Sequence, residues 1–168
     1  MPPLDEGSFL YMPSLMPHAG ISAATEVLAA QDRAFRDIPE VESVVGKIGR
    51  AETAIDPAPL GMIETVIQYK TEYKRDLLSG ELVVDEKGQP IRQWREHIRS
   101  PRDIWKEIQK AGDFPGVTGA PELQPISARL VMLQSGMRAP IGVKVFGRTL
   151  AEIETVGLRI AEILKSVP

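Results

Sequence analysis

Hydrophobic and polar positions follow two different periods along the first half of the chain. Residues 8–14 form a short apolar strand candidate that closes at a proline turn. After Ser22, a helix-capping residue type, apolar side chains repeat at helical spacing until Pro39. Residues 41–49 are rich in β-branched side chains, and the alternation over residues 62–70 gives the clearest strand pattern of the chain. The pattern therefore predicts a strand, a helix and two further strands.

After residue 70 the pattern is interrupted by an insertion and then continues with another helix and another strand. Two apolar segments flank a polar turn within residues 74–99, which predicts a small inserted hairpin. Pro101 and Asp103 are typical of a first helical turn, and this helix is expected to end at Gly112. A last strand is predicted over residues 127–134. The order βαββαβ is the split βαβ pattern of ferredoxin-like α+β domains, whose strands usually lie in the order 4-1-3-2.

A second unit is predicted to begin after residue 138. Residues 141–146 have the pattern of a strand, and Thr149 with Glu152 forms a capping box that opens an amphipathic helix. We therefore expect two domains: residues 1–138, which include the inserted hairpin, and residues 139–168. The second is interpreted as the first strand and helix of another, truncated copy of the same fold.

Composition excludes several classes of function. The net charge is −3 and aromatic residues make up 5% of the chain, so we expect no nucleic-acid partner. No apolar run is long enough to cross a bilayer, and we expect no secretory signal. Cysteine is absent and there are two histidines, so a bound metal would need carboxylate or thioether ligands. No catalytic motif and no cofactor-binding motif are predicted.

Methionine thioethers are the most distinctive candidate ligands. Strand parity places Met12 and Met62 on the side opposite the more apolar positions, whereas Met132 is ambiguous. Thioethers are soft, neutral ligands that favour Cu(I) or Ag(I) over Zn(II). Methionine is more often a core residue, however, and spacing alone does not define a metal site here.

Three sequence contexts carry a family resemblance: Tyr11-Met12-Pro13-Ser14, the segment 58–65 around Met62, and Met132 four residues before Gly136. With these contexts, and over nearly the whole chain apart from the 74–99 insert, the sequence resembles the heavy-metal-efflux branch of the resistance-nodulation-division (RND) transporters. Within that branch it is similar to the CusA-type copper/silver subgroup.

The resemblance implies a Cu(I) or Ag(I) site formed by Met12, Met62 and Met132 in a periplasmic cleft. Four charged residues that flank these contexts are the corresponding candidates for lining that cleft. They are Glu6, Asp56, Glu64 and Arg129.

The same resemblance implies a transporter segment rather than an enzyme. The chain would be a periplasmic portion of a proton-driven inner-membrane pump, which forms a homotrimer with a periplasmic adaptor and an outer-membrane channel. Two alternatives remain open. The first is a porter domain for another cargo, such as zinc, cobalt or an organic compound. The second is a stand-alone ferredoxin-like enzyme or binding module, with Asp56 and Glu64 as an acid/base pair.

Overall fold

The computed structural model describes residues 5–49, 61–76, 78–135 and 142–166. The chain divides into two compact units, residues 1–129 and residues 130–168, and each is described by itself. The domain boundary expected after residue 138 lies among residues outside the described ranges, so it stays a prediction.

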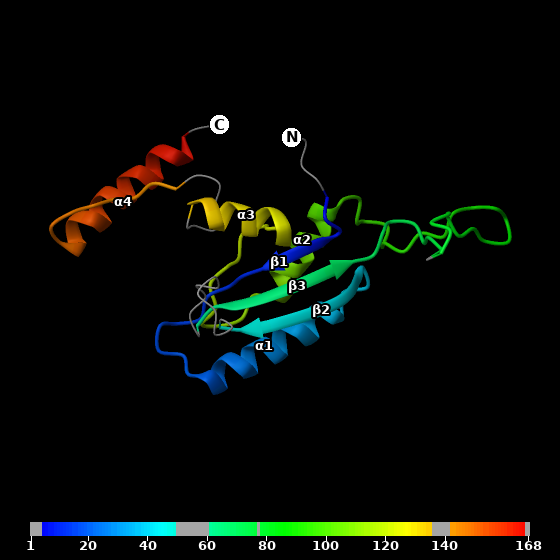
Figure 1. The fold of residues 1–168 in the computed structure, drawn as a ribbon, viewed down its shortest axis with the longest axis horizontal. Helices are drawn as coiled ribbons and strands as arrows, with labels where there is room; N and C mark the ends of the chain where they lie inside the picture. The colour runs from blue at the N-terminus through cyan, green and yellow to red at the C-terminus, as the bar shows by residue number, and fades with distance from the viewer. Residues whose placement is uncertain (1–4, 50–60, 77, 136–141, 167–168) are drawn as a thin grey trace. The chain divides into compact units, whose positions relative to one another are not determined.

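A three-stranded antiparallel sheet is the centre of the first unit (Figure 1). The strands are β1 (Ser8–Tyr11), β2 (Val41–Ile48) and β3 (Ile63–Tyr69), and their order in the sheet is β1-β3-β2. Helix α1 (Ile21–Arg36) joins the two edge strands, so that β3 lies between the strands that α1 connects. This arrangement matches the first three strands of the predicted fold and confirms an architecture of mixed helix and strand.

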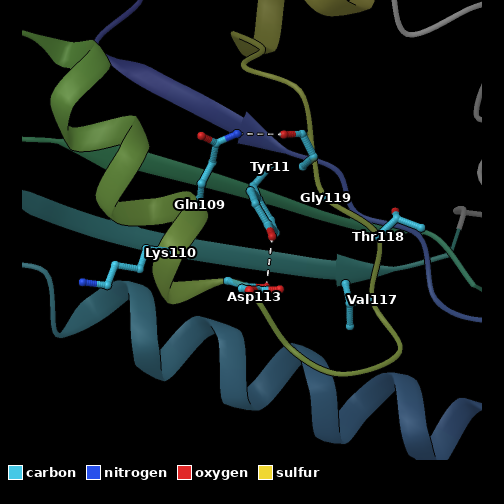
Figure 2. Close-up of a pocket in the computed structure, with 9 residues that line it drawn as sticks. Tyr11, Gln109, Lys110, Asp113, Val117, Thr118 and Gly119 are labelled. Carbon is cyan, nitrogen blue, oxygen red and sulfur yellow. Dashed lines mark hydrogen bonds between the residues drawn. The ribbon is translucent and has the colours of Figure 1, made fainter.

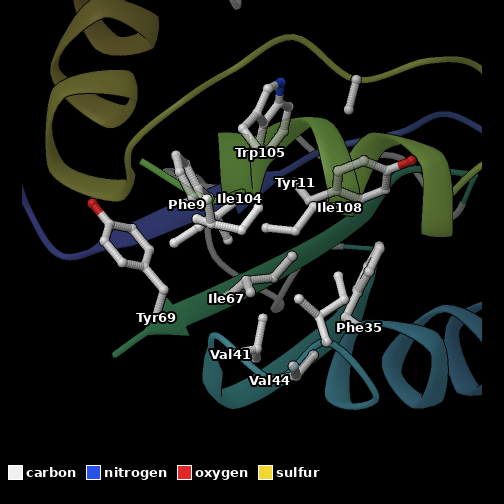
Figure 3. Close-up of a cluster of buried hydrophobic side chains, with 13 residues drawn as sticks. Phe9, Tyr11, Phe35, Val41, Val44, Ile67, Tyr69, Ile104, Trp105 and Ile108 are labelled. Atoms are coloured by element: carbon white, nitrogen blue, oxygen red, sulfur yellow. The ribbon is translucent and has the colours of Figure 1, made fainter. Parts of the chain in front are cut away.

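Both helices of the first unit pack on the same face of the sheet. Helix α2 (Pro101–Ala111) has the predicted bounds, with Pro101 in its first turn and Gly112 at its C-terminal cap. Figure 3 shows the side chains that form the core between these helices and the strands. The cluster comprises Phe9, Tyr11, Phe35, Ile38, Val41, Val44, Ile67, Tyr69, Ile98, Ile104, Trp105, Ile108 and Ala120. Odd-numbered positions of β1 and β3 supply this face, as the alternation of the sequence requires.

Close approach of α1 to β2 depends on one glycine. A Cβ atom on Gly46 would lie 2.3 Å from the Cδ1 atom of Leu28 and 2.9 Å from the Oγ1 atom of Thr65. Any side chain at this position would therefore require the side chains of Leu28, Asp32 and Thr65 to move.

The predicted insertion forms a small arm of β-bridges after β3. Arg75 pairs with Leu82, Val84 pairs with Pro90, and Tyr73 pairs with Arg92. Figure 1 shows the arm extending from the end of β3. These are isolated antiparallel bridges and not regular strands, and the one between Val84 and Pro90 closes the predicted turn.

The predicted strand over residues 127–134 is wrong, because Pro125–Ser135 form a helix, α3. The continuous apolar run from Leu130 to Leu133 does not distinguish a buried strand from a helix by its period. A helix N-terminus also needs partners for its free N–H groups, and here a carboxylate distant in sequence accepts two of them.

An irregular segment, residues 117–123, lies where a fourth strand would pair with β1. The backbone N–H of Thr118 donates to the carbonyl of Ser14 at 2.9 Å, and the N–H of Leu10 donates to the carbonyl of Leu123 at 2.8 Å. The segment thus runs antiparallel to β1, but its proline and glycine content opposes a regular ladder. Within the described residues, the fourth strand of the ferredoxin-like pattern is not formed.

The second unit contains the later part of α3 and helix α4 (Leu150–Lys165). As predicted, the hydroxyl of Thr149 accepts a hydrogen bond from the backbone N–H of Glu152 at 3.3 Å. The strand expected over 141–146 is not formed in its described part, since residues 142–146 have no regular secondary structure. No residue of α4 is buried.

Candidate metal-binding site

The face of the sheet opposite the aromatic core carries two of the predicted methionines. The register that pairs Tyr11 with Thr65 and bridges Ser14 with Met62 places Met12 directly opposite Glu64. Residues that are opposite in an antiparallel pair share a face, and so do residues two apart on one strand. Met12, Glu64 and Met62 therefore lie on one face, with Met12 and Met62 as diagonal neighbours across two strands.

Backbone hydrogen bonds hold the two methionine segments together. The N–H of Ile63 donates to the carbonyl of Pro13 at 3.2 Å, and the N–H of Leu15 donates to the carbonyl of Gly61 at 2.7 Å. Diagonal neighbours in an antiparallel pair have Cα atoms about 7–8 Å apart, within reach of two flexible thioether side chains. Met12 is 1% exposed, whereas Met62 is half-buried. The side predicted for both residues is confirmed, and Met12 is more buried there than a position on the polar side suggests.

Two cations neutralise the carboxylate between the methionines. Glu64 is 8% exposed, and its Oε2 atom lies 3.0 Å from the Nζ atom of Lys47 and 3.6 Å from an Nη atom of Arg129. Lys47 is the direct partner of Glu64 in the register between β2 and β3. Met12, Glu64 and Lys47 thus form one row across the three strands, and Arg129 reaches the row from α3. Glu64 and Arg129, both predicted to line the cleft, are brought together.

Lys47 is the member of this row that the sequence analysis did not single out. Its position becomes informative only with the pairing of β2 and β3, because sequence spacing does not reveal which lysine faces Glu64. The strand alternation around Met62 indicates the face of Glu64 but not its partner on β2.

Glu6 has a different role from the other charged candidates. Its carboxylate accepts hydrogen bonds from the backbone N–H groups of Ile126 at 2.7 Å and Ser127 at 2.9 Å, at the first turn of α3. Burial raises the pKa of the Glu6 carboxyl, but these hydrogen bonds lower it by more. The pKa of Glu6 therefore lies below its ordinary value of 4.5. Glu6 is therefore a capping residue for α3, and it precedes β1 at the end remote from Met12.

Of the remaining two candidates, the structure describes Met132 but not Asp56. Met132 lies on α3 and is half-buried. It follows Arg129 by three residues, a spacing that puts both side chains on one side of a helix. Asp56 lies outside the described residues, and its predicted contribution to the cleft stays a prediction.

A separate pocket of about 310 Å³ opens on the core side of β1. Figure 2 shows Tyr11 within it, with the phenol hydroxyl donating to the carbonyl of Gly112 at 3.1 Å. Burial, and secondarily the charge of Asp113, raises the pKa of this phenol. No methionine lines the pocket, because Tyr11 and Met12 are consecutive and project to opposite faces. The pocket is therefore distinct from the methionine-bearing face.

Within the described ranges, no group of three or more histidine, aspartate or glutamate side chains is arranged to hold a metal ion. In the same part of the chain, no helix has the length and apolarity needed to span a bilayer. The register places Met12 and Met62 on one face of the sheet, with Glu64 next to both.

Comparison with known proteins gives a consistent result. No family model matches the chain. The cation efflux system protein CusA of Escherichia coli K12 is 36% identical over all 168 residues, which correspond to 14% of CusA. The nickel and cobalt resistance protein CnrA of Cupriavidus metallidurans is 29% identical over 170 residues, again 100% of this chain and 14% of CnrA.

A solved structure agrees with these relatives. The crystal structure of a heavy metal efflux pump is 26% identical and superposes with a TM-score of 0.73. The match covers 98% of this chain and 15% of that protein. The fold and the matches make this chain similar to a mixed α/β segment of heavy-metal efflux proteins. The chain is related over its whole length to one segment of the heavy-metal efflux pumps, and the family resemblance seen in the sequence is confirmed. It spans about 14% of the length of the curated relatives that it matches.

Proposed function

We propose that this chain is a periplasmic, cargo-binding part of a proton-driven heavy-metal efflux pump, and that its cargo is Cu(I) or Ag(I). The ion is bound by the thioethers of Met12, Met62 and Met132. In the complete pump the chain works within a homotrimer that joins a periplasmic adaptor and an outer-membrane channel.

The observation that carries this proposal is the shared sheet face of Met12 and Met62. Two thioethers on neighbouring strands, in a chain without cysteine, form a soft and neutral donor set. Such donors favour monovalent soft ions and bind divalent first-row metals weakly. Met132 completes the set because the family resemblance assigns it to the same site.

The position of Met132 on a helix is compatible with a ligand that arrives from a separate element. Arg129, one turn earlier on α3, already contacts the methionine-bearing face through Glu64.

A divalent cargo is the second candidate function. The similarity to a nickel and cobalt resistance protein favours it, although that identity is lower than the identity to CusA. The relatives reported above are efflux and resistance proteins by name. They give no support to the alternative that the chain is a stand-alone enzyme.

Calorimetric titration of the 168-residue chain with Ag(I) and, separately, with Zn(II) tests the proposal. We expect Ag(I) to bind more tightly than Zn(II), and each of Met12→Leu, Met62→Leu and Met132→Leu to weaken Ag(I) binding by roughly tenfold or more. Leucine conserves volume, so these variants are expected to fold.

Met16→Leu is the matched control, since Met16 lies in a loop near the site and is 64% exposed. Its Ag(I) affinity is expected to equal that of the unmodified chain. Absence of Ag(I) binding, or Ag(I) binding that survives all three site substitutions, would rule out the proposed site.

A further inference from the structure

We propose that Lys47 and Arg129 determine the metal specificity of this face by occupying the carboxylate of Glu64, so that an incoming ion meets the thioethers and not this carboxylate. The inference rests on the proposed function, because it assigns the residues that keep divalent ions out of the methionine site.

Glu64 is placed where a metal ligand would be expected. It lies opposite Met12 and two residues from Met62 on the same face, so its carboxylate shares the environment of both thioethers. A glutamate that is 8% exposed is rarely left unpaired, and a metal ion is one of the partners that stabilises such a charge.

Lys47 and Arg129 are the partners of the Glu64 carboxylate in this structure. Both cations approach the same oxygen, Oε2, from two different elements, Lys47 from β2 and Arg129 from α3. The Lys47 contact follows directly from the strand register, so the sheet itself presents the ammonium group to the carboxylate.

The two cations beside Glu64 also discriminate between ions by charge. Lys47 and Arg129 each repel a dication twice as strongly as a monocation at the same distance. Thioethers are neutral and cannot offset that repulsion, whereas Cu(I) and Ag(I) gain from soft-ligand bonding and carry a single charge.

The relatives show that selectivity must depend on local side chains. The same length of chain matches both CusA and a protein named for nickel and cobalt resistance. A fold common to both cannot by itself select the ion, so the side chains of the site, ligands and their neighbours, must do so.

Removal of both cations tests the inference. In the variant Lys47→Gln/Arg129→Gln we expect Zn(II), added as a simple salt, to bind at least about tenfold more tightly than to the unmodified chain. Addition of Glu64→Gln to this variant should abolish the gain, because the released carboxylate is the new ligand.

Charge loss alone is controlled by Lys87→Gln/Arg33→Gln, which removes two exposed cations of the first unit away from Glu64. This control is expected to leave the Zn(II) affinity unchanged. Circular dichroism checks the fold of each variant. If the double variant does not fold, Lys47→Gln alone decides the question, because it leaves the Arg129 contact in place and should show a smaller gain.

Unchanged Zn(II) affinity in the folded variant, or a gain that persists after Glu64→Gln, would overturn the inference. Failure of the proposed function has a different signature, namely no Ag(I) binding by the unmodified chain. The Zn(II) measurements do not depend on that result.

Discussion

Among the described residues of the first unit, two glutamates are buried, and their surroundings differ. Glu40 is fully buried, and its carboxylate accepts hydrogen bonds from the backbone N–H of Arg95 at 2.8 Å and from the guanidinium at 2.8–3.1 Å. Glu64 is nearly as buried, but its partners at 3.0 and 3.6 Å are side chains that are 41% and 58% exposed. The first carboxylate is held by a bidentate, directional partner, and the second by two solvated cations.

The difference separates a structural charge from one that is available for function. Arg95 follows the arm and Glu40 precedes β2, so their ion pair fixes the return of the arm to the sheet. The backbone N–H of Lys70 also donates to the carbonyl of Glu40 at 2.8 Å, which joins the end of β3 to the same point. Glu64 joins no such junction and lies beside the methionines instead. We expect substitutions at the two sites to affect different measurements.

The largest effect is expected for Arg95→Ala. This change leaves the fully buried carboxylate of Glu40 without its partner, which costs about 3 kcal/mol of unfolding free energy. Urea unfolding followed by tryptophan fluorescence measures the effect, since Trp94 and Trp105 both lie in the first unit. Lys106→Ala, which removes a surface pair with Asp103, is the control and should cost a few tenths of a kcal/mol. Equal losses for the two variants would contradict the structural role of Glu40.

A smaller effect is expected for Glu40→Gln. The amide keeps the size of the side chain and one acceptor oxygen, but it loses the charge that strengthens the hydrogen bonds from Arg95. We expect a loss of about 1–2 kcal/mol in the same unfolding experiment. A gain in stability would mean that burying the charged carboxylate destabilises the fold by more than its hydrogen bonds stabilise it.

Lowering the pH should reduce the stability advantage of the unmodified chain over the Glu40→Gln variant. Burial raises the pKa of Glu40, but the hydrogen bonds from Arg95 outweigh this, and the net direction is below the ordinary value of 4.5. A carboxyl whose pKa is lower in the folded state stabilises fully above its unfolded pKa, and this stabilisation is lost as the pH falls through the folded pKa. The stability difference between the unmodified chain and Glu40→Gln is therefore expected to be constant near neutral pH and to shrink below about pH 4.5. A difference that grows on acidification would contradict the direction of the shift.

Local patterns in the sequence were sufficient for the elements whose signals lie within them. The alternation within residues 62–70 identifies β3, and Pro101 with Gly112 marks both ends of α2. Side-chain parity also places Met12 and Met62 on the correct face, because the period of a strand is fixed by its geometry.

Interactions between distant residues explain what the sequence did not reveal. Helix α3 is capped by Glu6, which lies 120 residues before Ile126, so the helix start has no local signature. The pairing of Lys47 with Glu64 depends on the register of two strands, and neither residue type nor spacing indicates it. The cation pair around Glu64, which distinguishes this site from an ordinary carboxylate site, was therefore accessible only from the three-dimensional structure.

The smallest effect on stability is expected for Glu64→Gln. Lys47 and Arg129 are both exposed enough to be solvated when their shared partner loses its charge, and exposed ion pairs contribute about 0–1 kcal/mol. The unfolding free energy should therefore fall by less than about 1 kcal/mol, measured by the same fluorescence assay used for Glu40→Gln. The two isosteric changes form a matched pair, since each replaces one buried carboxylate by an amide. A loss at Glu64 as large as that at Glu40 would mean that the row across the three strands supports the fold, and that the position of Glu64 beside the methionines is set by stability rather than by the ion.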